Sequence, residues 1–316
     1  MRKTALLFAG QGAQVVGMGR DLAASFPSAR AWFDRANSEL GCDLAAVCFD
    51  GPDAELTRTE YAQPGIFLVS WVAFQLLKER VPSLNFEASA GLSLGEFTAL
   101  TAAGAMRFED GLRVVRQRGR FMQEACDATR GGMAAIIGLD ETLTREVCAV
   151  AGVELANLNC PGQIVISGEL EKIAKAVELA KGKGAKRAIP LPVAGAYHSP
   201  LMASAKAKLK AELENVLLFP PTVTVISNVT ARPYDTGEIS SRLEMSLNLV
   251  EQVTASVRWE ESMRYLLAEG FARFIELGPG TALSGFMKRI DKNARMFNVA
   301  DVPSLEETVK SLGGEA

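Results

Sequence analysis

The sequence predicts a mixed α/β protein in which a small subdomain interrupts a main domain with a mainly parallel sheet. Strand-like and helix-like stretches alternate along most of the 316 residues, and 48% hydrophobic content supplies a large core. Between residues 131 and 194 the order becomes strand, helix, strand, strand, helix, strand, which is typical of ferredoxin-like units. We therefore predict a discontinuous main domain (1–130 and 195–316) and an inserted ferredoxin-like βαββαβ subdomain (131–194).

The first part of the main domain combines a buried strand with long helices. Residues 4–8 are apolar and lead into a glycine-rich turn, as a buried strand does. Pro64 suits the first turn of a helix, and the charge-free stretch 61–77 is too polar to span a membrane. The expected helices are 27–40, 64–80 and 109–126, and 86–90 ends a strand before a further helical stretch.

Gly131 and Gly132 mark the clearest boundary in the chain, because two adjacent glycines interrupt the preceding helical pattern. After them we expect strands 133–139, 153–158, 164–167 and 186–193, with helices 141–151 and 170–183. From residue 199 the α/β pattern of the main domain resumes. There we expect helices 199–218, 240–252, 259–269 and 281–290, and strands 223–229, 272–277 and 296–299.

Composition excludes several classes of protein. A net charge of -3 and a pI near 5.5 give no general attraction to nucleic acid or to an anionic membrane. Five cysteines without a Cys-x-x-Cys pair indicate reduced thiols and a cytoplasmic protein, and one histidine argues against a zinc site. The apolar stretch 5–9 is too short for a signal peptide. We expect no metal, no nucleic acid and no membrane contact.

The pentapeptide Gly91-Leu92-Ser93-Leu94-Gly95 is the strongest chemical signal. Glycines on both sides of a serine allow a sharp strand-to-helix turn, from which the hydroxyl projects beyond the sheet and the next amide faces a developing oxyanion. This pattern predicts acyl chemistry with Ser93 as the nucleophile.

His198 is the only histidine and the side chain best suited to take the serine proton. It lies where the predicted subdomain returns to the main domain; the alternative is a structural histidine capping the next helix. Asp110, Asp127 and Asp140 lie between Ser93 and His198, but all fall at helix ends. Several strands follow His198, which disfavours a plain hydrolase topology. A dyad whose imidazole is held by a backbone carbonyl is left open.

Arg118 is the one arginine of helix 109–126 that points inward, in a row with Gly111, Val115 and Met122. A buried guanidinium is costly unless a carboxylate meets it, so its partner is either a structural acid or a substrate acid. Gly10-Gln11-Gly12 lacks the full spacing of a dinucleotide loop. It is either a plain turn or a turn that lends an amide to an oxyanion hole.

With these residues assembled, the chain resembles the malonyl-CoA:acyl-carrier-protein transacylases of type II fatty-acid synthesis and the acyltransferase domains of polyketide synthases. The resemblance covers nearly the full length in seven ordered blocks. The blocks are Phe8 to Gln14 with Gly17-Met18-Gly19, Gly91 to Glu96, Arg118 to Gln123, Asn159 to Gln163, His198 to Met202, Gln252 with Val257-Arg258-Trp259, and Glu276 to Gly280.

The resemblance implies an α/β-hydrolase-like core and transfer of a malonyl group, through a malonyl-serine, to the phosphopantetheine thiol of acyl carrier protein. It implies Ser93 as nucleophile, His198 as base and Arg118 as ligand of the malonyl carboxylate. Gln11 and Leu94 become the backbone oxyanion donors, and the main-chain carbonyl of Gln252 orients His198. Malonyl-CoA and acyl carrier protein are the substrates, no cofactor is expected, and we expect a monomer.

Two positions depart from the family pattern. Leu92 stands where many relatives carry histidine, and Tyr197 belongs to a short motif that tracks with acyl preference in polyketide relatives. A different extender acyl-CoA in a polyketide pathway is therefore an alternative, as are a serine thioesterase or hydrolase and an inactive acyl-binding scaffold. Two basic clusters could meet the acidic carrier protein or CoA phosphates, or could be plain solvated surface. They are Lys181, Lys183, Lys186 and Arg187, and Lys288, Arg289 and Lys292.

Overall fold

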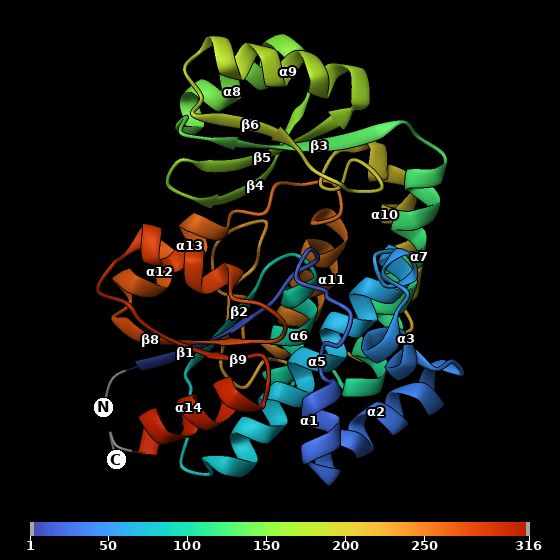
Figure 1. The fold of residues 1–316 in the computed structure, drawn as a ribbon, viewed down its shortest axis with the longest axis vertical. Helices are drawn as coiled ribbons and strands as arrows, with labels where there is room; N and C mark the ends of the chain where they lie inside the picture. Colours follow the sequence, from blue (N-terminus) through green and yellow to red (C-terminus); the bar gives the residue numbers. More distant parts are fainter. Residues whose placement is uncertain (1–2, 314–316) are drawn as a thin grey trace.

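The computed structural model describes residues 3–313, which form two sheets with helices around them (Figure 1). The first sheet has the strand order β7-β2-β1-β8-β9, and every neighbouring pair is parallel. Its strands are β1 (Lys3–Phe8), β2 (Ala88–Gly91), β7 (Thr224–Val225), β8 (Phe271–Leu277) and β9 (Arg295–Val299). Because parallel sheets are covered on both faces, their strands are apolar on both sides.

Strand β1 shows this double burial. Leu6 and Phe8 point into the larger core with the long helix α5, whereas Ala5 and Leu7 belong to the core under α12 and α13. The helices on the α5 side are α1 (Arg20–Ser25), α2 (Pro27–Leu40), α3 (Leu44–Asp50), α4 (Asp53–Leu56), α5 (Thr59–Arg80), α6 (Leu94–Ala102), α7 (Phe108–Asp127) and α14 (Val302–Gly313). The opposite face carries α12 (Trp259–Ala268) and α13 (Ala282–Ile290).

The second sheet is antiparallel, with the order β4-β5-β3-β6. Two helices cover its outer face, and its inner face is turned toward the main sheet (Figure 1). Its elements in chain order are β3 (Gly131–Ile137), α8 (Glu141–Ala151), β4 (Glu154–Cys160), β5 (Gln163–Glu169), α9 (Leu170–Gly182) and β6 (Arg187–Pro190). Both the mixed α/β class with its parallel main sheet and the ferredoxin-like order are thus confirmed. The exact domain limits stay a prediction.

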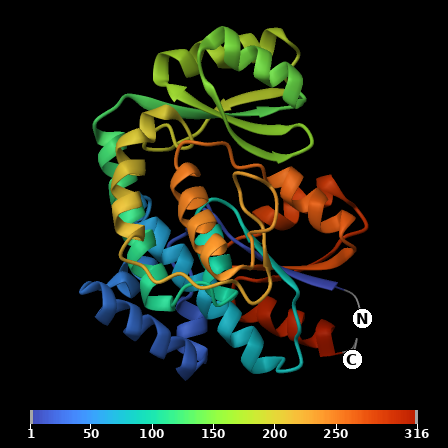
Figure 2. The ribbon, with the colours of Figure 1, turned by 180° about the vertical axis from the view of Figure 1, so that it is seen from behind.

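Two helices link the sheets on the side seen in Figure 2, where α7 and α10 (Ala203–Leu213) lie side by side. Helix α7 leads directly into β3, and the short 3-10 helix η1 (Pro200–Met202) precedes α10. Helix α11 (Glu238–Glu251) packs beside α10. Within residues 3–313, every helix is too short or too polar to cross a lipid bilayer.

Four predicted elements were wrong in extent. The strand predicted for 186–193 covers only β6, Arg187–Pro190. Helix α5 begins at Thr59 rather than at Pro64, because the Thr59 hydroxyl donates to the Gly119 carbonyl oxygen (2.5 Å) and ties the first turn to α7. The helix predicted for 199–218 ends at Leu213. The strand predicted for 223–229 has two residues, because the chain turns after Val225 and brings Asn228 under the serine turn. Helices α1, α3, α4 and α14 were not predicted.

Candidate active site

Ser93 lies between the end of β2 and the first residue of α6, with φ of 51°. A side chain at Gly91 would come within 1.9 Å of the Gly95 carbonyl group, so the turn closes only with glycine at 91. The strained backbone is held by Asn228, whose Oδ1 accepts from the Ser93 amide (2.7 Å) and whose Nδ2 donates to the Gly91 carbonyl (2.8 Å). The predicted serine turn is therefore present.

His198 lies opposite this turn. Its Nε2 is 2.9 Å from Ser93 Oγ, and its Nδ1 is 2.8 Å from the main-chain carbonyl oxygen of Gln252. A carbonyl only accepts, so Nδ1 carries the proton and Nε2 is free to accept one from the serine hydroxyl. The three aspartates lie elsewhere: Asp140 caps α8, and Asp110 and Asp127 lie at the ends of α7. The geometry is that of a Ser-His dyad oriented by a backbone carbonyl.

Arg118 reaches the same point from α7 and is 1% exposed. Its Nη2 donates to Ser93 Oγ (3.0 Å) and to Gln252 Oε1 (2.9 Å), and its Nη1 donates to Gln63 Oε1 (2.6 Å). Its Nε has no partner among the described residues. Neutral amides and a hydroxyl thus hold a fully buried cation, and no carboxylate of the described part of the chain is hydrogen-bonded to it. That arrangement leaves the charge available to a substrate acid.

Burial governs the charge states of both groups. It lowers the pKa of Arg118 to about 10, so the guanidinium is charged at neutral pH. Burial and the neighbouring Arg118 charge lower the pKa of His198 to about 4. The imidazole is therefore a neutral base across the physiological range.

The depressed pKa of His198 predicts the pH dependence of acyl loading. We expect the single-turnover rate to stay level from pH 7 to about pH 5 and to halve near pH 4, because only then does the imidazole bind a proton in the folded state. The unfolded chain binds that proton near 6.5, so this group also lowers stability as the pH falls from 6.5 toward 4. Rapid quench after a pH jump measures the rate; a midpoint near 6.5 would contradict the assignment.

A cavity of about 650 Å³ opens above the dyad, between the two sheets. Ser93 and His198 lie on its wall, and Met133, Val165 and Asn159 contribute from the inner face of the ferredoxin-like sheet. Asn159 is 5% exposed, and its Oδ1 has no hydrogen-bond partner among residues 3–313. The cavity wall is therefore largely apolar, and Asn159 Oδ1 is a buried acceptor without a described partner on it. Across the same range, no group of three acidic, cysteine or histidine side chains is placed to bind a metal ion.

The two predicted oxyanion donors lie beside the dyad. β1 pairs with β2 at Phe8 and Gly91, so the turn that carries Gln11 follows β1 next to the serine turn, and Gln11 lines the cavity. Leu94 is the first residue of α6, where no preceding helical turn can accept from its amide. The roles of both residues stay predictions.

Comparison with known proteins identifies the family. The model of the acyl transferase domain family matches residues 5–310. The chain belongs to this family. It is 43% identical over 320 residues to the malonyl CoA-acyl carrier protein transacylase of Bacillus subtilis (strain 168), covering 100% of this chain and 99% of that protein.

Solved structures that resemble this chain include malonyl transacylases. The malonyl CoA-acyl carrier protein transacylase of Clostridium perfringens superimposes with a TM-score of 0.93 at 38% identity, covering 99% of this chain and 98% of that one. A malonyl-transacylase solved in complex with a type II polyketide synthase acyl-carrier protein gives 0.91 at 35% identity, covering 98% and 99%. The resemblance inferred from the seven blocks is confirmed, and the chain is an acyltransferase.

The two departures from the family pattern have different surroundings in this acyltransferase. Leu92 packs against the core under α12 and α13 and lines the cavity beside Ser93. Tyr197 also lines the cavity, and its hydroxyl contacts Gln11 and Cys126; burial raises its pKa. Both side chains therefore shape the cavity that Ser93 lines.

Sequence reasoning missed several residues that support the acyltransferase site. Gln63, Glu96 and Asn228 are buried polar side chains that contact Arg118, Gln252 or the serine turn. One signal could have found Glu96: a charged residue in an otherwise apolar helix must have buried partners.

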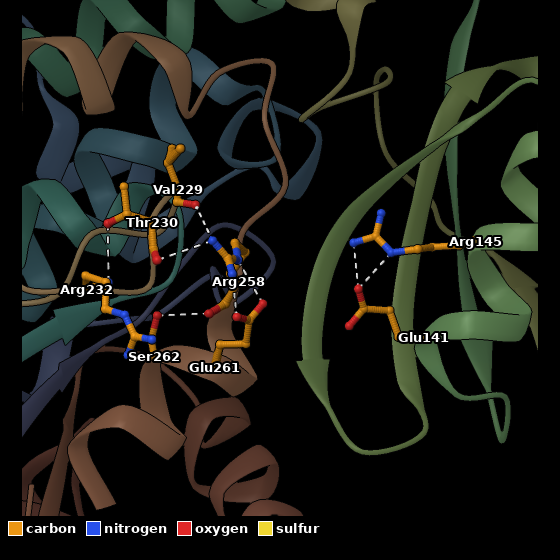
Figure 3. Close-up of polar contacts among 8 residues, drawn as sticks. All are labelled: Glu141, Arg145, Val229, Thr230, Arg232, Arg258, Glu261 and Ser262. Atoms are coloured by element: carbon orange, nitrogen blue, oxygen red, sulfur yellow. Dashed lines mark hydrogen bonds and ion pairs between the residues drawn. The ribbon is translucent and has the colours of Figure 1, made fainter. Parts of the chain in front are cut away.

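A further missed contact holds Asn228 in place. This contact comes from Arg258. Its amide donates to the Asn228 carbonyl oxygen (2.9 Å), and its guanidinium donates to the Val229 and Thr230 carbonyl oxygens (3.3 Å each). Figure 3 shows the contacts of the Arg258 guanidinium with Val229 and Thr230 and its pairing with Glu261 on α12. The block around Arg258 thus fixes the segment under the serine turn.

Proposed function

We propose that this acyltransferase moves a malonyl group from malonyl-CoA to the phosphopantetheine thiol of an acyl carrier protein, and so supplies fatty-acid elongation. The observation that carries the proposal is the buried Arg118 guanidinium, 3.0 Å from Ser93 Oγ and without a carboxylate partner. An acyl group with a terminal carboxylate places its charge on this cation while its thioester carbon meets the serine. The names of the relatives support the same substrates.

The reaction has two half-reactions that mirror each other. His198 Nε2 takes the proton of Ser93 as Oγ attacks the thioester carbon, and the Gln11 and Leu94 amides stabilise the oxyanion. The C–S bond breaks, the CoA thiolate takes the proton from His198, and malonyl-Ser93 remains. The carrier thiol then gives its proton to His198 and attacks the ester carbon. The bond from that carbon to Oγ breaks, and His198 returns the proton to Ser93 Oγ. No step requires a metal or a cofactor.

The cavity suits the arm that both substrates share. A pantetheine chain is extended, largely apolar and interrupted by two amides, and the Asn159 Oδ1 atom offers an acceptor for one amide N–H. A single passage that admits first CoA and then the carrier arm explains how one serine serves two thiols.

The transfer function is tested against a serine hydrolase by following the acyl group after loading. We expect malonyl on the wild-type serine to pass to a carrier thiol far faster than to water, because the cavity binds the pantetheine arm and orients its thiol. Radiolabelled malonyl-CoA with and without phosphopantetheinylated carrier protein measures both products. Free malonate as the main product in the presence of carrier would support the hydrolase instead.

For the carrier protein we propose the basic cluster at the C-terminal end of α13 rather than the one at the C-terminal end of α9. We call them the α13 cluster (Lys288, Arg289 and Lys292) and the α9 cluster (Lys181, Lys183, Lys186 and Arg187). Lys288 and Lys292 are exposed, and the inner side of α13 lines the cavity through Leu283 and Phe286. In the other cluster, Lys181 and Lys183 already pair with glutamates, at 2.7 Å each. The α13 cluster therefore lies nearer to the cavity that the phosphopantetheine arm must enter. Its lysines are also more available for ion pairs with an acidic partner than those of the α9 cluster.

Charge reversal separates the two clusters. We expect Lys288→Glu combined with Lys292→Glu to raise KM for the carrier protein about tenfold, because two attractions become repulsions. Malonyl loading from CoA should change less. Lys181→Glu is the matched control, expected to leave KM for the carrier unchanged. Steady-state transfer at fixed ionic strength measures both, and a larger effect at Lys181 would move the docking surface to α9.

We further propose a monomer that works in the cytoplasm; the cytoplasmic location is supported by five free cysteines, of which four are buried. A different extender acyl-CoA is the second candidate for the substrate, because Leu92 and Tyr197 depart from the common pattern beside the acyl group. Loading assays across acyl-CoAs decide between them: malonyl-CoA is expected to load fastest.

A further inference from the structure

Glu96 is a fully buried carboxylate in the apolar helix α6, three residues after Ser93. Its Oε1 accepts from the Tyr234 hydroxyl (2.5 Å) and from the Asn228 amide (3.2 Å). Its Oε2 accepts from Gln252 Nε2 (2.5 Å). It does not line the cavity, and the mechanism does not use it. A buried acid is expensive to retain, so its contacts indicate what it does.

Gln252 is the residue through which Glu96 reaches the dyad and the arginine. Its main-chain carbonyl receives the His198 Nδ1 proton (2.8 Å), and its Oε1 receives Arg118 Nη2 (2.9 Å). Its Nε2 donates to Glu96 and to the Ser93 carbonyl (3.0 Å). The carboxamide satisfies these groups in one orientation only, because a 180° flip would turn an NH2 group toward Arg118 and an oxygen toward two acceptors.

We propose that Glu96 is a positioning residue that fixes the Gln252 carboxamide and, through it, the orientation of the Arg118 guanidinium toward the substrate carboxylate. The inference rests on the proposed function, since it takes Arg118 as the ligand of the malonyl carboxylate. Glu96 itself touches no substrate. Its effect is on the choice between carboxylated and uncharged acyl groups, which depends on where the guanidinium points.

The orientation is kept whether or not Glu96 is ionised. Burial raises its pKa to about 7. A bound proton must sit on Oε1, where the Tyr234 hydroxyl can turn to accept it, because Gln252 Nε2 only donates to Oε2. In both states Oε2 is an acceptor, so the Gln252 carboxamide keeps its direction.

The test is Glu96→Gln, which keeps the size of the side chain, removes its charge and replaces one carboxylate oxygen by an NH2 group. The Asn228 amide requires an oxygen on its side, so the new NH2 group faces Gln252 Nε2, and the repulsion favours the flip that sets NH2 against Arg118. Single-turnover loading with malonyl-CoA and acetyl-CoA is measured, together with thermal unfolding. We expect the malonyl-to-acetyl rate ratio to fall about tenfold or more, the range for a hydrogen bond to a charged group.

Tyr234→Phe is the matched control. It removes another hydrogen bond to the same carboxylate but leaves Oε2 facing Gln252, so stability should fall while the rate ratio stays within about twofold. If E96Q does not fold, Gln252→Met gives the same readout, because it keeps the main-chain carbonyl for His198 and deletes the side-chain link. Gln252→Met should also lower the malonyl-to-acetyl rate ratio.

The outcomes separate this inference from the function on which it rests. An unchanged ratio in E96Q or in Gln252→Met, with wild-type malonyl transfer intact, overturns the positioning role alone. If the malonyl-to-acetyl rate ratio falls as far in Tyr234→Phe as in E96Q, the positioning role is also overturned. The loss would then come from a general destabilisation of the site. A wild-type protein that loads no malonyl contradicts the proposed function itself.

Discussion

Replacing Ser93 with alanine is expected to abolish the covalent acyl-enzyme and to slow malonyl transfer by about 10⁵-fold or more. The reason is chemical: within residues 3–313, Ser93 Oγ is the only hydroxyl that is hydrogen-bonded to His198 Nε2 (2.9 Å), so no other described group is placed to give its proton there. Intact-mass spectrometry after incubation with malonyl-CoA measures the adduct. The expected spectrum of the variant shows unmodified protein only.

Ser89→Ala is the matched control for that experiment. Ser89 is a buried serine of β2, four residues before Ser93, and its hydroxyl donates to the Ala99 carbonyl (3.2 Å) rather than to the histidine. We expect this variant to form the adduct as the wild type does. A malonyl adduct that survives Ser93→Ala would place the nucleophile elsewhere.

Replacing Arg118 with alanine is expected to lower malonyl loading about 10²- to 10³-fold and acetyl loading much less. Under the proposed function the guanidinium binds the malonyl carboxylate through charge-assisted hydrogen bonds, and acetyl has no carboxylate to lose. Arg118 Nη2 also donates to Ser93 Oγ, so some loss with acetyl-CoA is expected. Single-turnover rates with both acyl-CoAs give the comparison, and thermal unfolding reports the cost of emptying a buried site.

Arg118→Lys separates charge from shape. Lysine keeps the positive charge but lacks the planar fork, so malonyl loading should recover only in part. Equal losses for malonyl and acetyl in Arg118→Ala would remove Arg118 from carboxylate recognition.

The sequence predicted the residues that meet at the candidate site but not those that hold them in place. The glycines around Ser93 form a local pattern that is typical of a nucleophilic serine, and the chain has one histidine to serve as its base. Helical spacing alone predicted that Arg118 points inward. Asn228 and Gln63 carry no such pattern, because their partners lie 135 and 55 residues away in the chain. Only the packing of α5, α7 and the segment after β7 brings these groups together.

Element boundaries failed for a related reason. Local preference placed the start of α5 at Pro64, but a contact from Thr59 to the α7 backbone begins the helix a turn earlier. The predicted strand 223–229 is β-branched at several positions, yet it ends at Val225. The chain turns there, and Asn228 accepts a hydrogen bond from the Ser93 amide instead of continuing the strand. In both places a tertiary contact outweighs local propensity.

The most direct test of the account is a pulse-chase on the wild-type protein. Malonyl-CoA is added and removed, the acyl-enzyme is located by peptide mapping, and phosphopantetheinylated carrier protein is then supplied. The predicted result is one malonyl group on Ser93 that disappears as malonyl appears on the carrier thiol. A modified residue other than Ser93, or release of the group as free malonate in the presence of carrier, would contradict it.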